Sequence, residues 1–178
     1  MRQSCKKSLI RWNSQTRPSQ RTQRHGERDK ETMKPQKQAL KHNPPDVYGD
    51  CFRTALASIM NLDRDKVPHF NNGKPCDDYW QIVSKWLSSH DLVLFSIPFS
   101  GELPDILCTM KNINPGLYYL LAGKSPRGYG HQVVALDDAI VCDPAPQGGG
   151  LVGPCPDDGL YWVNLLLPMA IHKEENSP

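Results

Sequence analysis

The sequence predicts an α+β domain in which helices pack against an antiparallel β-sheet. Helical patterns dominate the chain up to residue 113, and four short segments with β-type composition follow from residue 116 onward. Helices followed by a run of strands are typical of this class. A chain of 178 residues is also long enough for one domain with its own core. We therefore expect a single folded domain at residues 33–172.

The chain begins with a strongly basic segment. Its first 42 residues hold 12 of the 21 Lys and Arg residues but only 3 of the 19 Asp and Glu residues. The apolar residues there have no sustained period, so burial would not offset the entropy lost on ordering. We expect residues 1–32 to be a disordered extension, with Met33 as the alternative start, and residues 173–178 to be a disordered tail. Arg-rich segments neutralise phosphates, so nucleic acid is a partner only through this extension.

The sequence has neither a signal-peptide pattern nor a stretch of about 18 apolar residues that would span a membrane. We expect a cytoplasmic protein that does not bind membranes. Its six cysteines are widely spaced and form no C-x-x-C motif. In a reducing compartment this spacing favours free thiols over disulfides or a metal site.

The first predicted helix spans residues 51–62 and is apolar on nearly every side, which is typical of a buried, central helix. Asp50 stands where an N-cap belongs. Cys51 is then the first helical residue, where free backbone N–H groups and the helix dipole favour a thiolate. Because cysteine is also a common core residue, this position alone does not separate a nucleophile from a packing residue.

A second helix is predicted after a cap at Asp77 or Asp78, because apolar residues recur at three- and four-residue intervals up to Ser89. The same spacing places Trp80 and Trp86 in the core. The remaining expected elements are a strand at 91–98, a helix at 102–113, strands at 116–123, 131–136, 139–143 and 160–168, and an exposed loop at 144–159.

Two polar residues stand at the ends of neighbouring predicted strands. His131 opens one strand and Asp143 closes the next. A three-residue connection at 136–138 would place both side chains on one face, whereas a two-residue turn would place them on opposite faces. An Asp can orient an imidazole that takes the proton of a thiol. Together with Cys51, these residues would supply a nucleophile, a base and an orienting group.

This order of residues resembles the papain-like cysteine peptidase superfamily. It is similar above all to small papain-like proteins often encoded by phages and prophages, of the bacteriocin-processing-peptidase type. The similar stretches are GDCFRTALASIMNLDRDKVPHF, YWQIVSKWL, and GKSPRGYGHQVVALDDAIVCDPAP with GGGL. The resemblance covers residues 33–151. It implies a papain-like fold, with a central, N-terminal Cys-bearing helix packed on a C-terminal antiparallel sheet.

The resemblance implies a thiol protease-like site in which Cys51 is the nucleophile, His131 the base and then the acid, and Asp143 the orienting group. A Gln upstream of the cysteine usually donates to the oxyanion in such enzymes. Gln38 is the candidate, with Gln36 as the alternative. Gln38 lies 13 residues before Cys51, a longer separation than is usual in the superfamily. The residue after Cys51 is also a Phe, where peptidases commonly have a small residue.

Two further residues are candidates for substrate binding. Arg127 would bind a carboxylate or phosphate, or else only hold its own loop. His69 would line the site, or else cap a helix or face solvent. No phosphate-binding glycine motif of a nucleotide site is present.

These observations predict a cysteine-dependent hydrolase of the peptidase or amidase type, acting through a covalent thioester without a metal or cofactor. Its substrate would be a peptide or amide, such as part of a host protein. One alternative is a deamidase or transglutaminase-like acyl transferase with the same triad. The other is a non-catalytic papain-fold binding protein of phage origin. For a phage protein, the cytoplasm would be that of the host.

Overall fold

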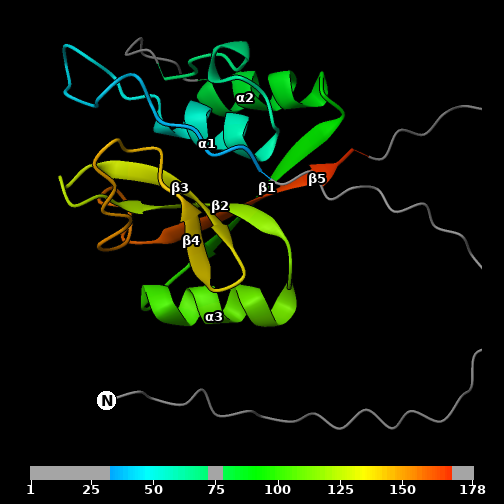
Figure 1. Cartoon of the computed structure of the whole chain (residues 1–178), viewed down its shortest axis with the longest axis vertical. Coiled ribbons are helices and arrows are strands. Elements are labelled where there is room, and N and C mark those ends of the chain that lie inside the picture. The colour runs from blue at the N-terminus through cyan, green and yellow to red at the C-terminus, as the bar shows by residue number, and fades with distance from the viewer. Residues whose placement is uncertain (1–32, 72–77, 170–178) are drawn as a thin grey trace, which may run out of the picture. The chain divides into compact units, whose positions relative to one another are not determined.

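The computed structural model of the chain describes residues 33–71 and 78–169. The extension expected at 1–32, the tail expected at 173–178 and the cap expected at Asp77 lie outside these residues. The described part contains three α-helices, a short 3₁₀ helix and one five-stranded antiparallel sheet (Figure 1). The predicted α+β class is therefore confirmed. The elements are α1 (Cys51–Ile59), η1 (Arg64–Lys66), α2 (Tyr79–Ser88), β1 (Leu92–Phe99), α3 (Leu103–Ile113), β2 (Tyr118–Lys124), β3 (Gly130–Leu136), β4 (Ala139–Cys142) and β5 (Tyr161–Pro168).

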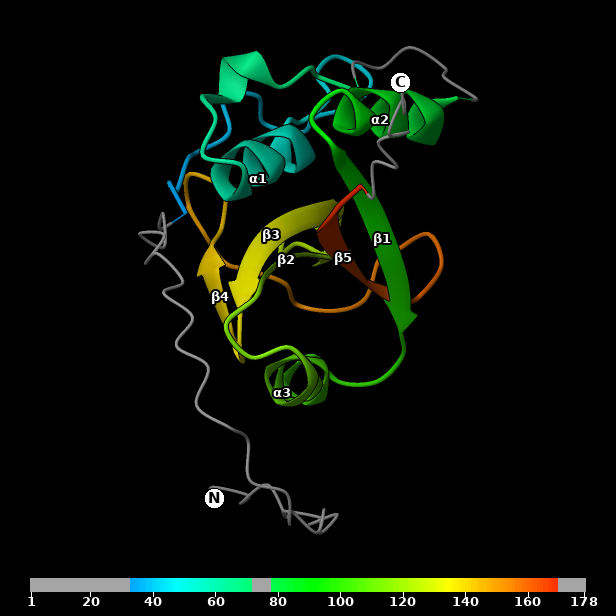
Figure 2. The ribbon, with the colours of Figure 1, turned by 90° about the vertical axis from the view of Figure 1, so that its right-hand side faces the viewer.

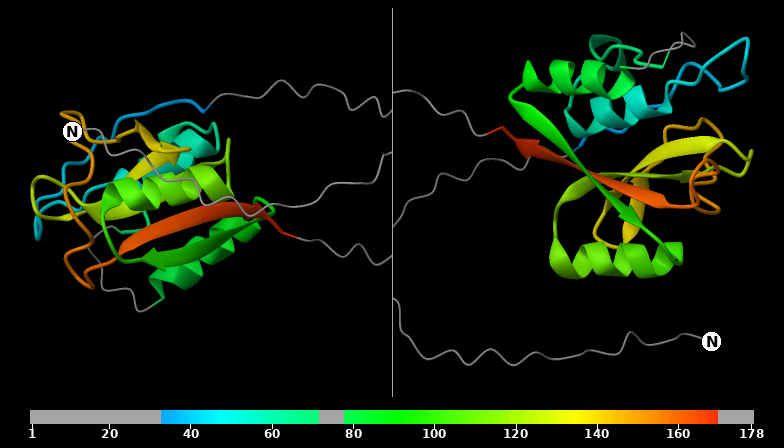
Figure 3. Two further views of the ribbon diagram at one scale, coloured as in Figure 1. Left: turned by 90° about the horizontal axis from the view of Figure 1, so that it is seen from below. Right: turned by 180° about the vertical axis from the view of Figure 1, so that it is seen from behind.

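The sheet has the strand order β1-β5-β2-β3-β4, and every neighbouring pair is antiparallel. Strand β5 thus lies between β1 and β2. Strands β1 and β5 pair along their whole lengths, and the view from below shows them side by side (Figure 3, left). Because β5 is inserted there, the loop that precedes it is joined to the same sheet that contains the β3–β4 hairpin.

Helices cover both faces of the sheet. Helices α1 and α2 lie on one face and α3 lies on the other (Figures 1 and 2). Each interface has its own apolar cluster: Leu56 and Leu87 pack with Val134 on one side, and Met110 packs with Val133 on the other. Consecutive strand residues point to opposite faces. Successive residues of β3 therefore supply both clusters.

Helix α1 is buried along its middle, as its apolar sequence predicts. Its two buried hydroxyl groups are satisfied within the helix, since Thr54 donates to the Asp50 carbonyl at 2.8 Å and Ser58 to the Thr54 carbonyl at 2.9 Å. The helix ends at Ile59, three residues earlier than predicted. Asn61 adopts a left-handed conformation with φ of 53°, which closes the helix in the way that C-terminal caps do.

Helix α2 packs on the sheet through Val83 and Leu87, which are buried. Its Trp80 does not join the core, contrary to the prediction, and is 59% exposed. Trp86, by contrast, packs against the cluster beneath α1 and α2. Trp80 stands in the first turn of the helix, beyond the residues with which α2 meets the sheet, and its side chain borders a hollow described below.

In the part of the chain that the structure describes, no helix has the length and apolar character needed to cross a membrane.

Candidate active site

Cys51 is the first residue of α1 and is half-buried. Asp50 occupies the N-cap position, as predicted, but its side chain makes no capping bond to the helix. Its carboxylate turns away: Oδ1 accepts a hydrogen bond from the Leu40 backbone at 2.9 Å, and Oδ2 lies 3.7 Å from Nε of Arg64. The first-turn backbone N–H groups beside Cys51 are thus left without a side-chain cap, which suits a site for developing negative charge.

His131 and Asp143 form a direct pair. Nε2 of His131 lies 2.8 Å from Oδ1 of Asp143. Asp143 also accepts hydrogen bonds from the backbone N–H groups of Ala145 and Gly150, each at 2.8 Å. The carboxylate is therefore held on three sides. Because Nε2 is engaged by Asp143, Nδ1 is the nitrogen of His131 that remains for a thiol.

The hydrogen-bond network changes the proton affinity of both partners. Burial alone would lower the pKa of His131, but Asp143 and the Cys51 sulfur stabilise the imidazolium and raise that pKa to about 9. Burial would raise the pKa of Asp143, but the hydrogen bonds from His131, Gly150 and Ala145 lower it to about 2. An imidazolium next to an ionised carboxylate is therefore the stable form at neutral pH.

The pair forms through a geometry that strand counting did not foresee. Leu136 pairs with Ala139, so the turn has two residues, which in a regular ladder would place His131 and Asp143 on opposite faces. The register shifts between Val134 and Ala135, where Val141 is an extra residue in β4. This β-bulge restores the parity and turns Asp143 toward His131.

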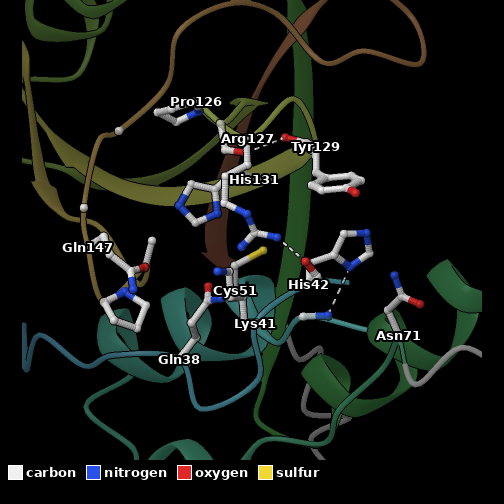
Figure 4. A pocket seen from close by; sticks show the side chains of 17 residues that line it. Gln38, Lys41, His42, Cys51, Asn71, Pro126, Arg127, Tyr129, His131 and Gln147 are labelled. Atoms are coloured by element: carbon white, nitrogen blue, oxygen red, sulfur yellow. Dashed lines mark hydrogen bonds between the residues drawn. The ribbon is translucent and has the colours of Figure 1, made fainter. Parts of the chain in front are cut away.

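Gln38 reaches the site despite its distance along the chain. Its backbone N–H donates to the Pro144 carbonyl at 2.9 Å, beside Asp143, and the next anchor, Leu40, is bound by Asp50. The side chain is buried and lines the same hollow as Cys51 (Figure 4). Its amide donates one hydrogen bond to the Leu40 carbonyl at 3.0 Å, and its buried Oε1 has no partner among the described residues.

Gln36, the alternative candidate, serves another purpose. Its amide donates to the Leu62 carbonyl at 2.7 Å and accepts from the Arg64 backbone at 2.9 Å. Both bonds tie the N-terminal segment to the turn after α1. Of the two glutamines, the structure brings only Gln38 to the hollow that contains Cys51.

The hollow has a volume of about 570 Å³, and Cys51, His131 and Gln38 all line it (Figure 4). Arg127 lines it, and its guanidinium donates to the His42 carbonyl and lies 5.5 Å from the centre of the Tyr129 ring. Arg127 thus holds the segment that carries His42 and also faces the hollow, and its binding of a carboxylate or phosphate stays a prediction. Nε2 of His69 instead lies 3.2 Å from the Gly49 carbonyl oxygen. His69 is not among the described residues that line the hollow.

Several lining residues had no signal in the sequence. Lys41 and His42 belong to a Pro-containing segment that reads only as a loop, and Tyr129 belongs to a Gly-rich turn. Tyr79 was expected only to pack, yet burial and the neighbouring Cys51 raise the pKa of its hydroxyl. These residues meet the site through tertiary contacts, which local patterns do not report.

Comparison with known proteins gives no relative: no family model, no curated protein and no solved structure matches this chain.

Proposed function

We propose that the protein is a cysteine-dependent hydrolase that cleaves a peptide, amide or isopeptide bond. The observation that carries this proposal is the His131–Asp143 pair at 2.8 Å, whose imidazole faces the same hollow as Cys51 at the start of α1. Cys51 is only half-buried and lines this hollow together with His131, unlike a cysteine enclosed in an apolar core. The resemblance to papain-like proteins supports the same chemistry.

In the proposed reaction, His131 already holds the proton as an imidazolium, and Cys51 attacks the carbonyl carbon of the substrate as the thiolate of that pair. The carbonyl oxygen becomes an oxyanion, which the Cys51 backbone N–H and the Gln38 amide would stabilise. The imidazolium then gives its proton to the leaving amine, and a thioester to Cys51 remains. Water, deprotonated by His131, attacks the thioester and releases the acid and the thiol.

Site-resolved alkylation tests this proposal without a known substrate. We expect iodoacetamide to modify Cys51 faster than Cys155, because burial and the carboxylates of Asp158 and Asp157 raise the pKa of the Cys155 thiol to about 11. Replacing His131→Ala should slow the modification of Cys51 and leave that of Cys155 unchanged. Mass spectrometry of the digested protein measures both rates.

Uniform, slow labelling of Cys51 and Cys155 would contradict a catalytic cysteine and favour the binding protein instead. A deamidase or acyl transferase would share the reactive Cys51. A deamidase would release ammonia when the thioester forms, and an acyl transferase would pass the acyl group to an amine instead of water. Product analysis with and without an added primary amine separates these outcomes.

A further inference from the structure

A second hollow, of about 700 Å³, adjoins the first. The two share the residues at their junction: both are lined by Cys51, Asn71, Gly130 and His131. The second hollow continues over the start of α2 and along β1 and β5 to the loop at 155–158. Together they form a groove that passes the candidate nucleophile, as an extended chain bound across Cys51 would require.

Apart from His131, which lines both halves at their junction, the two halves of this groove carry opposite charges. Lys41 and Arg127 line the first half, and no Asp or Glu of the described chain does. Asp157 and Asp158 line the second half, to which residues 33–71 and 78–169 contribute no Lys or Arg. We call the second half the acidic half. A charge-divided groove favours a ligand whose own charges are divided in the matching order.

The acidic half also has an aromatic wall. The exposed indole of Trp80 lines it, together with Trp162. The Trp162 N–H donates to Oδ2 of Asp158 at 2.7 Å, and the Leu160 backbone donates to Oδ1 at 2.9 Å. These bonds hold the carboxylate against the ring and lower the pKa of Asp158, so it stays ionised. Carboxylates beside indole rings suit an ammonium or guanidinium group.

The base of the acidic half is polar and contains two buried amide side chains, those of Gln132 and Asn164. Gln132 of β3 is 6% exposed and lines this half, and its Nε2 has no hydrogen-bond partner among the described residues. Asn164 and Ser96 also line it and pair with each other across β5 and β1. An unpaired buried donor costs stability, which a ligand acceptor would recover. A peptide carbonyl oxygen is such an acceptor.

We propose that the acidic half binds a Lys or Arg side chain of a peptide, and that Gln132 donates a hydrogen bond to a carbonyl oxygen of the same peptide. The inference rests on the proposed function, because it assigns the substrate class of the same groove. The charge division would then fix the direction of the peptide relative to Cys51. Its cationic residue lies toward Asp157 and Asp158, and the opposite end lies toward Lys41 and Arg127.

Equilibrium binding to the Cys51→Ala protein tests this assignment without turnover. The probes are acetylated, amidated Ala pentapeptides with Lys at each position in turn, matched by the same set with norleucine, which has a similar length but no charge. We expect the best Lys peptide to bind about tenfold tighter than its norleucine partner. The preference should weaken as ionic strength rises, because exposed charges are screened. Titration followed by tryptophan fluorescence measures the affinities.

Charge-removing variants locate the preference. We expect the added changes Asp157→Asn and Asp158→Asn to abolish it. The control changes Glu102→Gln and Asp105→Asn remove the same charge at the start of α3, which does not line the groove, and should preserve it. Equal binding of the Lys and norleucine peptides to the Cys51→Ala protein would overturn the proposal. So would a preference that survives the loss of both Asp157 and Asp158.

Gln132→Met separates the hydrogen bond from the charge. It removes a buried donor that has no partner among residues 33–71 and 78–169, so the protein should remain folded. We expect this variant to weaken Lys and norleucine peptides by the same factor, and unchanged affinity would overturn the role of Gln132. Slow alkylation of Cys51 combined with an intact Lys preference would reject the hydrolase and retain the cation site.

Discussion

His131 is the residue on which the proposed chemistry depends, and its surroundings make its proton affinity measurable. The Asp143 carboxylate at 2.8 Å and the Cys51 sulfur raise its pKa to about 9. The imidazolium is therefore the resting form at neutral pH, ready to protonate a leaving amine. The same interaction predicts that its loss of a proton will limit activity on the alkaline side.

Replacing Asp143→Asn should move the titration of His131 to lower pH, because the variant lacks the negative charge that stabilises the imidazolium. Proton NMR of the imidazole Cε1–H measures this directly, with the signal assigned by its loss in His131→Ala. We expect a midpoint near 9 in the wild-type protein. A wild-type midpoint near 6.5, unchanged by Asp143→Asn, would contradict the pairing.

At the scale of elements, Asp50 joins the N-terminal segment to α1. Its side chain is fully buried, accepts from the Leu40 backbone at 2.9 Å and lies 3.7 Å from Arg64. This contact explains how Gln38 returns to the start of the helix over a long loop. The placement of Gln38 therefore depends on a cap residue that has turned away from its own helix.

We expect Asp50→Ala to lower the free energy of unfolding by about 1–3 kcal/mol, because the Leu40 N–H loses its hydrogen bond to the buried Asp50 carboxylate. Asp50→Asn should cost less, since the amide oxygen can still accept that bond. Urea unfolding gives both values. Asp50→Ala should also slow the alkylation of Cys51 relative to Asp50→Asn if Gln38 is displaced. Equal stability of the two variants would contradict the anchoring role.

Gly123 in β2 allows the loop before β5 to approach the sheet. A Cβ atom there would lie 2.7 Å from the Gly153 carbonyl and 3.0 Å from the Tyr161 ring. The neighbouring Lys124 exchanges backbone hydrogen bonds with this loop, to the Gly153 carbonyl and from the Val152 N–H, both at 2.8 Å. The loop that carries the acidic residues of the groove is thus attached at this point.

We expect Gly123→Ala to destabilise the protein by about 1–3 kcal/mol, because the backbone contact cannot relax without moving the loop. Gly130→Ala is the matched control in the next strand, where an added Cβ meets no atom within 4 Å. Chemical denaturation compares the two variants. A Gly123→Ala protein as stable as the control would show that the loop does not need this close approach.

At the scale of the whole molecule, the His131–Asp143 pair makes stability depend on pH. The folded-state pKa of His131 is about 9, above its ordinary value of 6.5, so the stabilisation is complete below 6.5 and is lost as pH rises through 9. The pKa of Asp143 is about 2, below its ordinary value of 3.8. The stabilisation from the ionised carboxylate is therefore complete above 3.8 and is lost as pH falls through 2.

We therefore expect the difference in unfolding free energy between wild type and Asp143→Asn to be largest between pH 4 and 6.5 and to shrink by pH 9.5. Its size should be on the order of 2 kcal/mol. Urea titrations of both proteins at several pH values measure the difference. A constant difference from pH 4 to 9.5 would mean that the pair does not stabilise the fold.

Local patterns predicted most elements of the fold. The spacing of apolar residues indicates α2, and β-type composition between turn residues indicates the strands. They failed where one residue ends an element or where a contact with a distant part of the chain determines burial. Asn61 ends α1 early through its left-handed backbone, and Trp80 leaves the core because the contact of α2 with the sheet lies further along the helix. The two-residue turn alone would place His131 and Asp143 on opposite faces of the sheet. The bulge at Val141 returns them to the same face.

The residues of the candidate triad were predictable because each has a chemical role that fits its place at an element end. The rest of the groove was not. Gln132, Asp157 and Asp158 come from a strand interior and a turn, and nothing in their own neighbourhoods indicates that they share a hollow. Their meeting depends on β5 entering the sheet between β1 and β2, a topology that the sequence pattern does not reveal.

Asp143 holds two things at once: the imidazole of His131, and the loop at 145–150, whose Ala145 and Gly150 both bind the carboxylate and line the first hollow. The loop that lines the hollow and the imidazole that would transfer protons are therefore both held by the Asp143 carboxylate. We expect a ligand that displaces this loop to change the hydrogen bonds of the Asp143 carboxylate, and with them the pKa of His131. Ligand binding in the groove should therefore be detectable as a shift in the pKa of His131.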